Sequence, residues 1–150
     1  MQAEWRDGGL ARLWFVDEGP CEAPRTAAES ELVRQLSEYF AGQRREFDVP
    51  LNFNGTDFQK RVWNALLALP YGETISYAEL SLRLGDLKAI RAVGRANGAN
   101  PICILVPCHR IIGSDGSLTG YAFGVERKRR LLEIEGVQNF SAEQIQMFPK

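Results

Sequence analysis

The sequence lacks the features that mark membrane, secreted and disulfide-stapled proteins. No uninterrupted apolar stretch is longer than five residues, as at positions 102–106, so we expect no transmembrane helix, which needs about 20. The opening segment is polar and charged, so we expect no signal peptide. Three cysteines, an odd number without paired spacing, argue against a disulfide framework and favour a reducing cytoplasm.

Patterns of metal ligands and phosphate loops are also lacking. The candidate ligands are Cys21, Cys103, Cys108 and His109, and no CxxC or HxxxH pair occurs among them. The glycines at positions 113–116 lack the strand, helix and lysine that surround a phosphate-binding loop. We therefore expect neither a metal nor a cofactor.

What the 150 residues do have is an ordinary globular composition, 45% hydrophobic and 25% charged. This length favours one compact unit or two small domains that share a core. Residues 1–57 carry 6 Lys or Arg against 11 Asp or Glu, whereas residues 58–150 carry 12 against 8. A basic second part suits a polyanion such as nucleic acid, although mixed surface charge also divides this way by chance.

The first part is predicted to be a small α/β unit. We expect a strand, a helix and an extended segment at residues 10–16, 26–40 and 46–53. The extended segment is an edge strand or a linker, because Pro50 cannot donate to a strand ladder. A turn at residues 54–57 marks the boundary, so we predict one domain at 1–55 and a second at 56–150.

The second part is predicted to be mainly helical. Helices are expected at residues 58–69, 76–84 and 87–97. Ser76 followed by Glu79 forms a capping-box pattern, and the two short helices joined at Gly85 resemble a helix-turn-helix. A buried strand, a hairpin-like loop and a final helix are expected at residues 102–106, 113–120 and 126–135.

Cys108 is the candidate nucleophile. It follows the apolar run and lies between Pro107 and His109-Arg110, so we expect its thiol at a strand end facing a cleft. Only about a few per cent of an ordinary cysteine is thiolate at neutral pH, and the two adjacent basic side chains would lower this pKa. The alternative is a buried packing cysteine, which is our prediction for Cys103.

His109, the single histidine, is the candidate base. Neighbours in an extended chain point to opposite sides, so a water or a bend must lie between His109 and the Cys108 thiol. A histidine base needs a carboxylate to orient it, and Glu135 near the end of the final helix is the best candidate. Taken by itself, however, Glu135 fits an ordinary solvated helix residue.

The helix at 87–97 is a candidate nucleic-acid surface. Arg91 and Arg95 lie four residues apart and therefore on one face. Small side chains occupy much of the remainder, at Ala89, Ala92, Gly94, Ala96 and Gly98. This combination suits close approach to a nucleic-acid groove, and it equally suits a helix packed tightly on a neighbour with solvated arginines.

A series of short motifs in one order resembles the O6-alkylguanine-DNA alkyltransferase family, also called methylated-DNA–protein-cysteine methyltransferases. The motifs cover nearly all of residues 58–136. They are Phe58-Gln59 with Val62-Trp63, Pro70-Tyr71-Gly72-Glu73-Thr74 with Ser76-Tyr77, Arg91-Ala92-Val93-Gly94 with Ala96-Asn97, Asn100-Pro101, Pro107-Cys108-His109-Arg110, Gly120-Tyr121, Lys128, Leu131-Leu132 and Glu135-Gly136. Each is weak alone, but together they are very specific.

The resemblance implies a fold and an activity. The fold is α/β, with a small ribonuclease-H-like N-terminal domain and a winged-helix-like, mainly α C-terminal domain that carries a helix-turn-helix. The activity is repair of double-stranded DNA by irreversible transfer of an alkyl group from O6-alkylguanine, and possibly O4-alkylthymine, to the protein itself. The nucleotide is flipped out of the duplex, and each molecule acts once because the thioether product resists water.

Individual roles also follow from the resemblance alone. Cys108 is the alkyl acceptor, His109 is its base acting through a water, and Glu135 orients the imidazole. Asn100 holds the turn before the acceptor, and Arg91 replaces the flipped nucleotide in the stack. Tyr77 is implied as a catalytic residue that helps to rotate the nucleotide and donates a hydrogen bond to the purine ring. Further DNA contacts are implied at Ala89, Arg95 and Ser114, and further lesion contacts at Ile111, Tyr121, Ala122 and Phe123.

Three departures from the family pattern lead to further expectations. Phe123 stands where many relatives have glycine, so we expect a narrower pocket that disfavours large adducts. No strand is expected before residues 10–16, although the family usually has one there. Cys21 is the only cysteine of the first part, which has no histidine, so the zinc site of some relatives is not expected.

Other functions remain as alternatives. A non-catalytic, alkyltransferase-like lesion-binding protein is disfavoured because those relatives replace the acceptor cysteine. A transcription regulator that uses methylcysteine as a signal needs a longer regulatory domain, and a thiol hydrolase needs a second, distant histidine. We expect a monomer with no membrane partner.

Overall fold

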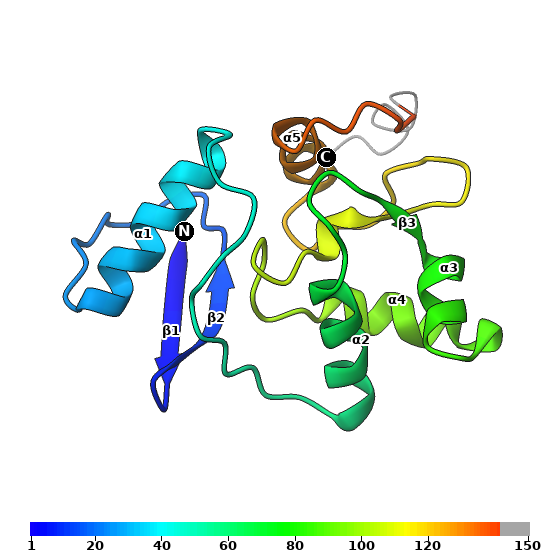
Figure 1. Cartoon of the computed structure of the whole chain (residues 1–150), viewed down its shortest axis with the longest axis horizontal. Coiled ribbons are helices and arrows are strands. Elements are labelled where there is room, and N and C mark those ends of the chain that lie inside the picture. Colours follow the sequence, from blue (N-terminus) through cyan, green and yellow to red (C-terminus); the bar gives the residue numbers. More distant parts are fainter. Residues whose placement is uncertain (142–150) are drawn as a thin grey trace.

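The computed structural model describes residues 1–141 as a mixed α/β chain (Figure 1). The strands are β1 (Gln2–Arg6), β2 (Gly9–Trp14), β3 (Ile75–Ser76) and β4 (Ile111–Ile112). The α-helices are α1 (Ala27–Phe40), α2 (Asp57–Leu67), α3 (Tyr77–Arg83), α4 (Ile90–Gly98) and α5 (Val125–Ile134), and the 3-10 helices are η1 (Leu87–Ala89) and η2 (Cys108–Arg110). The predicted fold class is confirmed, whereas residues 142–150 of the predicted second domain lie outside the described residues.

The N-terminal part begins with an antiparallel hairpin of β1 and β2, which lies beside α1 in Figure 1. The expectation that no strand precedes residues 10–16 is therefore wrong. Asp7 and Gly8 both have positive φ, 48° and 79°, as a type I′ hairpin turn requires. This Asp-Gly pair is a hairpin signal that our sequence analysis did not use.

The free side of β2 joins the two parts of the molecule. The Leu10 N–H donates to the Pro50 carbonyl at 2.8 Å, so the segment at 46–53 meets β2 through an isolated bridge. Further along, the Leu13 N–H donates to the Pro101 carbonyl and the Cys103 N–H donates to the Leu13 carbonyl. The strand of the N-terminal part therefore supports the chain that leads to Cys108.

The prediction of a buried strand at 102–106 is wrong. Only Ile102 bridges β2, and the chain then turns at Ile104, which has a φ of 72°. A positive φ is a marked outlier for a β-branched residue. The run is buried as expected, but an apolar run of this length does not by itself distinguish a strand from another buried segment.

Helices α2 and α3 each begin directly after a side chain that caps the helix. The Thr56 side chain accepts from the Gln59 N–H in a reciprocal capping box before α2, and the Ser76 side chain accepts from the Glu79 N–H before α3. The helix expected at 87–97 divides into η1 and α4. Helix α4 packs against α2 and α3, and the Trp63 indole donates to the Ala96 carbonyl at 2.8 Å.

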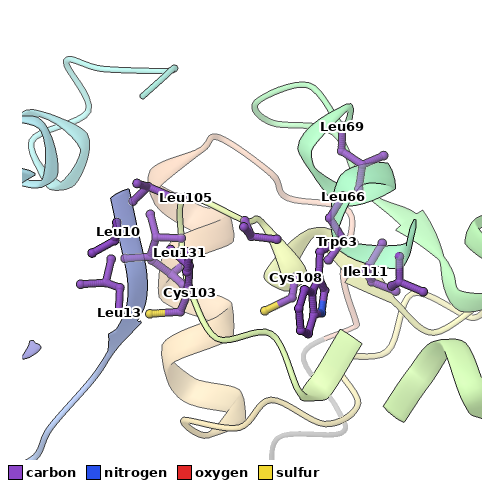
Figure 2. Packing of buried hydrophobic residues seen from close by; sticks show 14 of the residues in the cluster. Leu10, Leu13, Trp63, Leu66, Leu69, Cys103, Leu105, Cys108, Ile111 and Leu131 are labelled. Atoms are coloured by element: carbon purple, nitrogen blue, oxygen red, sulfur yellow. The ribbon is translucent and has the colours of Figure 1, made fainter. Parts of the chain in front are cut away.

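One buried apolar cluster runs through both parts of the chain. It includes Leu10 and Leu13 of β2, Trp63 of α2 and Leu131 of α5, together with both Cys103 and Cys108 (Figure 2). The segment that carries Cys103 and Cys108 thus lies in the core that the two parts share. Within residues 1–141 no helix is long and apolar enough to cross a membrane.

Candidate active site

Cys108 is the first residue of η2, immediately after a tight turn at Pro107. The Cys108 N–H donates to the Val106 carbonyl at 2.9 Å, and Pro107 has φ −84° and ψ 63°, which is an inverse γ-turn. Cys108 is only 6% exposed. The expected strand end is therefore wrong, and Cys108 is absent from the lining of the nearby cleft of about 590 Å³, to which Pro107 and Arg110 contribute.

The surroundings of the Cys108 thiol shift its pKa in opposite directions. Burial raises the pKa of the thiol, whereas a hydrogen bond from Asn100 and the positive charge of Lys128 lower it. We expected the adjacent Arg110 to lower this pKa, but its guanidinium is directed to Glu135 instead. The thiol therefore needs a proton acceptor to become a nucleophile.

His109 supplies an acceptor nitrogen. Its side chain is completely buried, and Nε2 lies 2.7 Å from Oε1 of Glu135. Among the described residues, Nδ1 is buried without a hydrogen-bond partner. Because burial lowers the pKa of His109 and outweighs the nearby carboxylate, the neutral imidazole donates from Nε2 and keeps a lone pair on Nδ1.

Glu135 is buried at the C-terminal cap of α5, so the simpler expectation of a solvated helix residue is wrong. Arg110 donates to Oε2 from Nε at 2.9 Å and to Oε1 from a terminal nitrogen at 3.0 Å. The Tyr39 hydroxyl donates to Oε1 at 2.7 Å, and the Gly72 N–H donates to Oε2 at 3.2 Å. Burial raises the pKa of Glu135, but the hydrogen bonds from His109 and Arg110 outweigh it and hold this pKa well below its ordinary value.

Lys128 is a buried cation that sequence reasoning matched to the family without giving it a role. Its Nζ donates to the carbonyls of Thr119 and Gly120 at 3.2 and 3.4 Å, and the Tyr77 hydroxyl donates to the same Thr119 carbonyl at 3.0 Å. Burial lowers the pKa of Lys128 to about 8, while the neighbouring Cys108 opposes this shift. Lys128 and Tyr77 together fix the start of the loop that continues through Tyr121.

Asn100 braces the chain that leads to Cys108. Its amide donates to the Val106 carbonyl at 2.7 Å, and its side-chain oxygen accepts from the Ile102 N–H at 3.0 Å. These two bonds satisfy backbone groups that a strand ladder would otherwise pair. This side chain therefore holds the irregular segment that we had expected to be a strand.

Tyr77 begins α3, and the other residues expected around the lesion lie on the loop before α5 and on β4. The Phe123 ring packs edge-on against Tyr121, with ring centres 5.7 Å apart, and against Phe15, at 5.5 Å. Ala122 is exposed beside them, and Ile111 is buried where β4 pairs with β3. The rings of Phe123, Tyr121 and Phe15 therefore form an aromatic wall to which both parts of the chain contribute.

The residues expected to contact DNA fall in two places. Arg91 and Arg95 are exposed on α4, and Ala89 is half-buried at the end of η1 just before them. Ser114 is exposed on the loop after β4. Within the described residues, no group of three or more His, Cys, Asp or Glu side chains lies close enough to hold a metal ion.

Two protein families match this chain. Residues 57–137 match the family described as 6-O-methylguanine DNA methyltransferase, DNA binding domain, and residues 6–53 match the ribonuclease-like domain of the same description. A methylated-DNA–protein-cysteine methyltransferase of Mycobacterium tuberculosis is 60% identical over 112 residues, which cover 75% of this chain and 68% of the relative.

Solved structures also resemble the fold. Mycobacterium tuberculosis OGT in complex with DNA has a TM-score of 0.81 at 48% identity, covering 95% of this chain and 90% of that one. S. pombe Atl1 in complex with damaged DNA containing O6-carboxymethylguanine has a TM-score of 0.50 at 30% identity, covering 57% of this chain and 81% of that one.

Proposed function

Because the chain belongs to the methylated-DNA–protein-cysteine methyltransferase family, we propose that it repairs DNA by taking the alkyl group of O6-alkylguanine onto its own Cys108. One observation carries this proposal: Cys108 directly precedes a histidine whose Nε2 is held by a buried carboxylate and whose Nδ1 has no hydrogen-bond partner within residues 1–141. That arrangement is a base built to accept a thiol proton.

The reaction is a single displacement at the alkyl carbon. The Cys108 thiol gives its proton to Nδ1 of His109 through an intervening water, and the thiolate sulfur attacks the alkyl carbon. The carbon–sulfur bond forms as the bond from carbon to O6 breaks, and the released guanine takes up a proton. The thioether offers no carbonyl for water to attack, so each molecule acts once.

Glu135 and Asn100 are positioning residues in this scheme, because they act on His109 and Cys108 and not on the alkyl group itself. Glu135 holds the imidazole in the tautomer that leaves Nδ1 free and stabilises the imidazolium once the proton arrives. Asn100 holds the 102–106 segment and donates a hydrogen bond that favours the thiolate. Tyr77, Ile111, Tyr121, Ala122 and Phe123 form the surroundings of the extruded base.

DNA binding is assigned to the surface of η1 and α4 and to the loop after β4. A duplex hides O6 of guanine within the stack, so the nucleotide must be extruded before transfer. Arg91 fills the gap that this leaves, while Ala89, Arg95 and Ser114 contact the DNA. The small side chains of α4 allow close approach to the minor groove. Because the chemistry needs a free thiol, we place the protein in a reducing cytoplasm.

Lesion binding without transfer is the second candidate, favoured by the likeness to Atl1. The two functions separate in one assay, with duplex DNA containing O6-methylguanine mixed with protein in increasing amounts. We expect one restored guanine per protein molecule, and none with Cys108→Ala although that variant still binds the duplex. Binding by the unaltered protein with no guanine restored would establish the lesion-binding function instead.

A further inference from the structure

A tyrosine of the N-terminal part reaches the acid–base pair of the C-terminal part. Tyr39, near the end of α1, is completely buried, and its hydroxyl donates to Oε1 of Glu135 at 2.7 Å. Its ring packs against Phe47 and Tyr71, with ring centres 5.5 and 6.3 Å away. The two bonded side chains are 96 residues apart in the chain.

The Tyr39 hydroxyl shares its acceptor atom with the histidine. Oε1 of Glu135 takes hydrogen bonds from His109 at 2.7 Å, Tyr39 at 2.7 Å and Arg110 at 3.0 Å, while Oε2 is held by Arg110 and the Gly72 N–H. Each donor draws on the negative charge of the same carboxylate. Removing one donor therefore leaves more charge for the imidazole.

We propose that Tyr39 is a positioning residue for alkyl transfer. It holds the Glu135 carboxylate against His109, and by sharing Oε1 it weakens the attraction between the carboxylate and a protonated imidazole. Tyr39 thereby keeps His109 neutral, so that Nδ1 is free when the thiol gives up its proton. This inference rests on the proposed function, because it assigns Tyr39 a part in that reaction. It also explains why the N-terminal part, which carries none of the reacting groups, is packed against the segment that carries Cys108 and His109.

The charged and titratable groups around His109 show in which direction loss of the Tyr39 hydroxyl shifts the pKa of His109. Arg110 and Lys128 lower the pKa of His109, and Glu135 raises it. Burial and the carboxylate raise the pKa of Tyr39, so its hydroxyl remains a donor across the working pH range. The Tyr71 hydroxyl and the Cys108 thiol remain neutral groups, because burial raises the pKa of each. Loss of the Tyr39 hydroxyl therefore raises the pKa of His109.

The test compares Tyr39→Phe with Tyr71→Phe in the full chain. Tyr71 is the matched control because its hydroxyl donates to the Ile134 carbonyl and does not bond the carboxylate. The single-turnover rate on DNA containing O6-methylguanine is measured from pH 5 to pH 8.5. This range extends well below the ordinary histidine pKa of roughly 6.5, because burial lowers the pKa of His109. For Tyr39→Phe we expect a rate about tenfold lower at the acid end of this range and about threefold lower near pH 8, with the acid midpoint moved upward by roughly half a unit.

The control and one further variant decide the outcome. Tyr71→Phe should keep the acid midpoint of the unaltered protein. Incorporation of 3-fluorotyrosine at position 39 makes the hydroxyl a stronger donor at nearly the same size, so the midpoint should move downward, opposite to Tyr39→Phe. Unmoved midpoints in both Tyr39 variants would overturn the inference and leave only a packing role. Failure of the unaltered protein to transfer the alkyl group would instead overturn the proposed function.

Discussion

Cys103 and Cys108 lie five positions apart in one buried segment, and burial raises the pKa of both. Cys103 is 1% exposed, and its backbone N–H bonds Leu13 of β2 within the apolar cluster (Figure 2). Cys108 is 6% exposed and lies near the Asn100 amide and the Lys128 ammonium, directly before His109.

The difference between the two sites lies in polar surroundings and not in depth. Apolar packing alone stabilises the neutral thiol and makes a cysteine inert. Cys108 has the same burial together with a hydrogen-bond donor, a cation and a neighbouring base. Under the proposed function, the C-terminal part makes one of two buried thiols a nucleophile. Each prediction below removes or weakens one of the features that distinguish Cys108 from Cys103.

Exchange of each cysteine for alanine should give the largest contrast. Cys108→Ala should lower alkyl transfer by at least about 10³-fold, because no other group replaces the nucleophile, while DNA binding persists. Cys103→Ala should keep the rate within about threefold and lower the free energy of unfolding by about 1 kcal/mol through a small cavity. Single-turnover assays and urea unfolding measure both. Transfer that persists in Cys108→Ala would contradict the assignment.

Loss of the buried carboxylate should come next in size. Glu135→Gln should slow transfer by about 10²-fold or more and destabilise the fold by about 3 kcal/mol, because Arg110 loses its charged partner while buried. Glu133→Gln on the same helix is the control, since Glu133 is exposed and forms its ion pair with Arg129 at the surface. Equal effects of the two changes on rate would remove Glu135 from the mechanism.

Acid should destabilise the protein through the same group. The pKa of Glu135 in the fold lies well below its ordinary value of about 4.3, so its contribution to stability is complete above that ordinary value. The contribution is lost as the pH falls from there towards the lower pKa of the folded state. Urea unfolding at stepped pH should show this loss, and Glu135→Gln should flatten it. A variant that keeps the slope of the unaltered protein would refute the prediction.

Removal of the buried ammonium should reduce transfer by a smaller factor. Lys128→Met keeps the length of the side chain but removes the charge that favours the Cys108 thiolate and the two bonds to the loop at 119–120. We expect single-turnover transfer to slow by about tenfold. Arg130→Met is the control, because Arg130 is exposed on the same helix. Equal rates in Lys128→Met and the control would show that the thiol does not depend on this cation.

The aromatic wall should affect selectivity more than rate. Phe123→Gly removes a ring that packs on Tyr121 and Phe15, so the pocket should admit larger adducts. The ratio of benzyl to methyl transfer should rise several-fold, an effect of about 1 kcal/mol. Competition between the two adducts in duplex DNA measures this ratio, and an unchanged ratio would exclude a narrowing role for Phe123.

Local chemistry made part of this molecule predictable. The capping pattern at Ser76–Glu79 located the start of α3, and the spacing of apolar residues located α2, because these signals lie within one or two turns of chain. Cys108 stood out through its neighbours in sequence. The motif resemblance added the family, and the comparisons confirm that membership.

Contacts between distant segments were not predictable in the same way. The bond from Tyr39 to Glu135 spans 96 residues, and no local pattern shows that a helix-end glutamate turns inward. The apolar run at 102–106 is buried without being a strand, because Asn100 satisfies backbone groups that a ladder would pair. The inward orientation of Glu135 and the irregular backbone at 102–106 both depend on tertiary contacts that no short window of sequence shows. The domain boundary at residue 55 and the individual site roles stay predictions.

The most direct test of the contrast between the two thiols is the position of the adduct. The protein is mixed with excess duplex DNA containing O6-methylguanine, weighed intact and digested with trypsin. Cys103 and Cys108 fall on one tryptic peptide, residues 96–110, so fragment ions must separate them. We predict a gain of one methylene unit per molecule, all of it on Cys108. A methyl group on Cys103, or no gain with the DNA bound, would contradict the assignment of Cys108 as the acceptor.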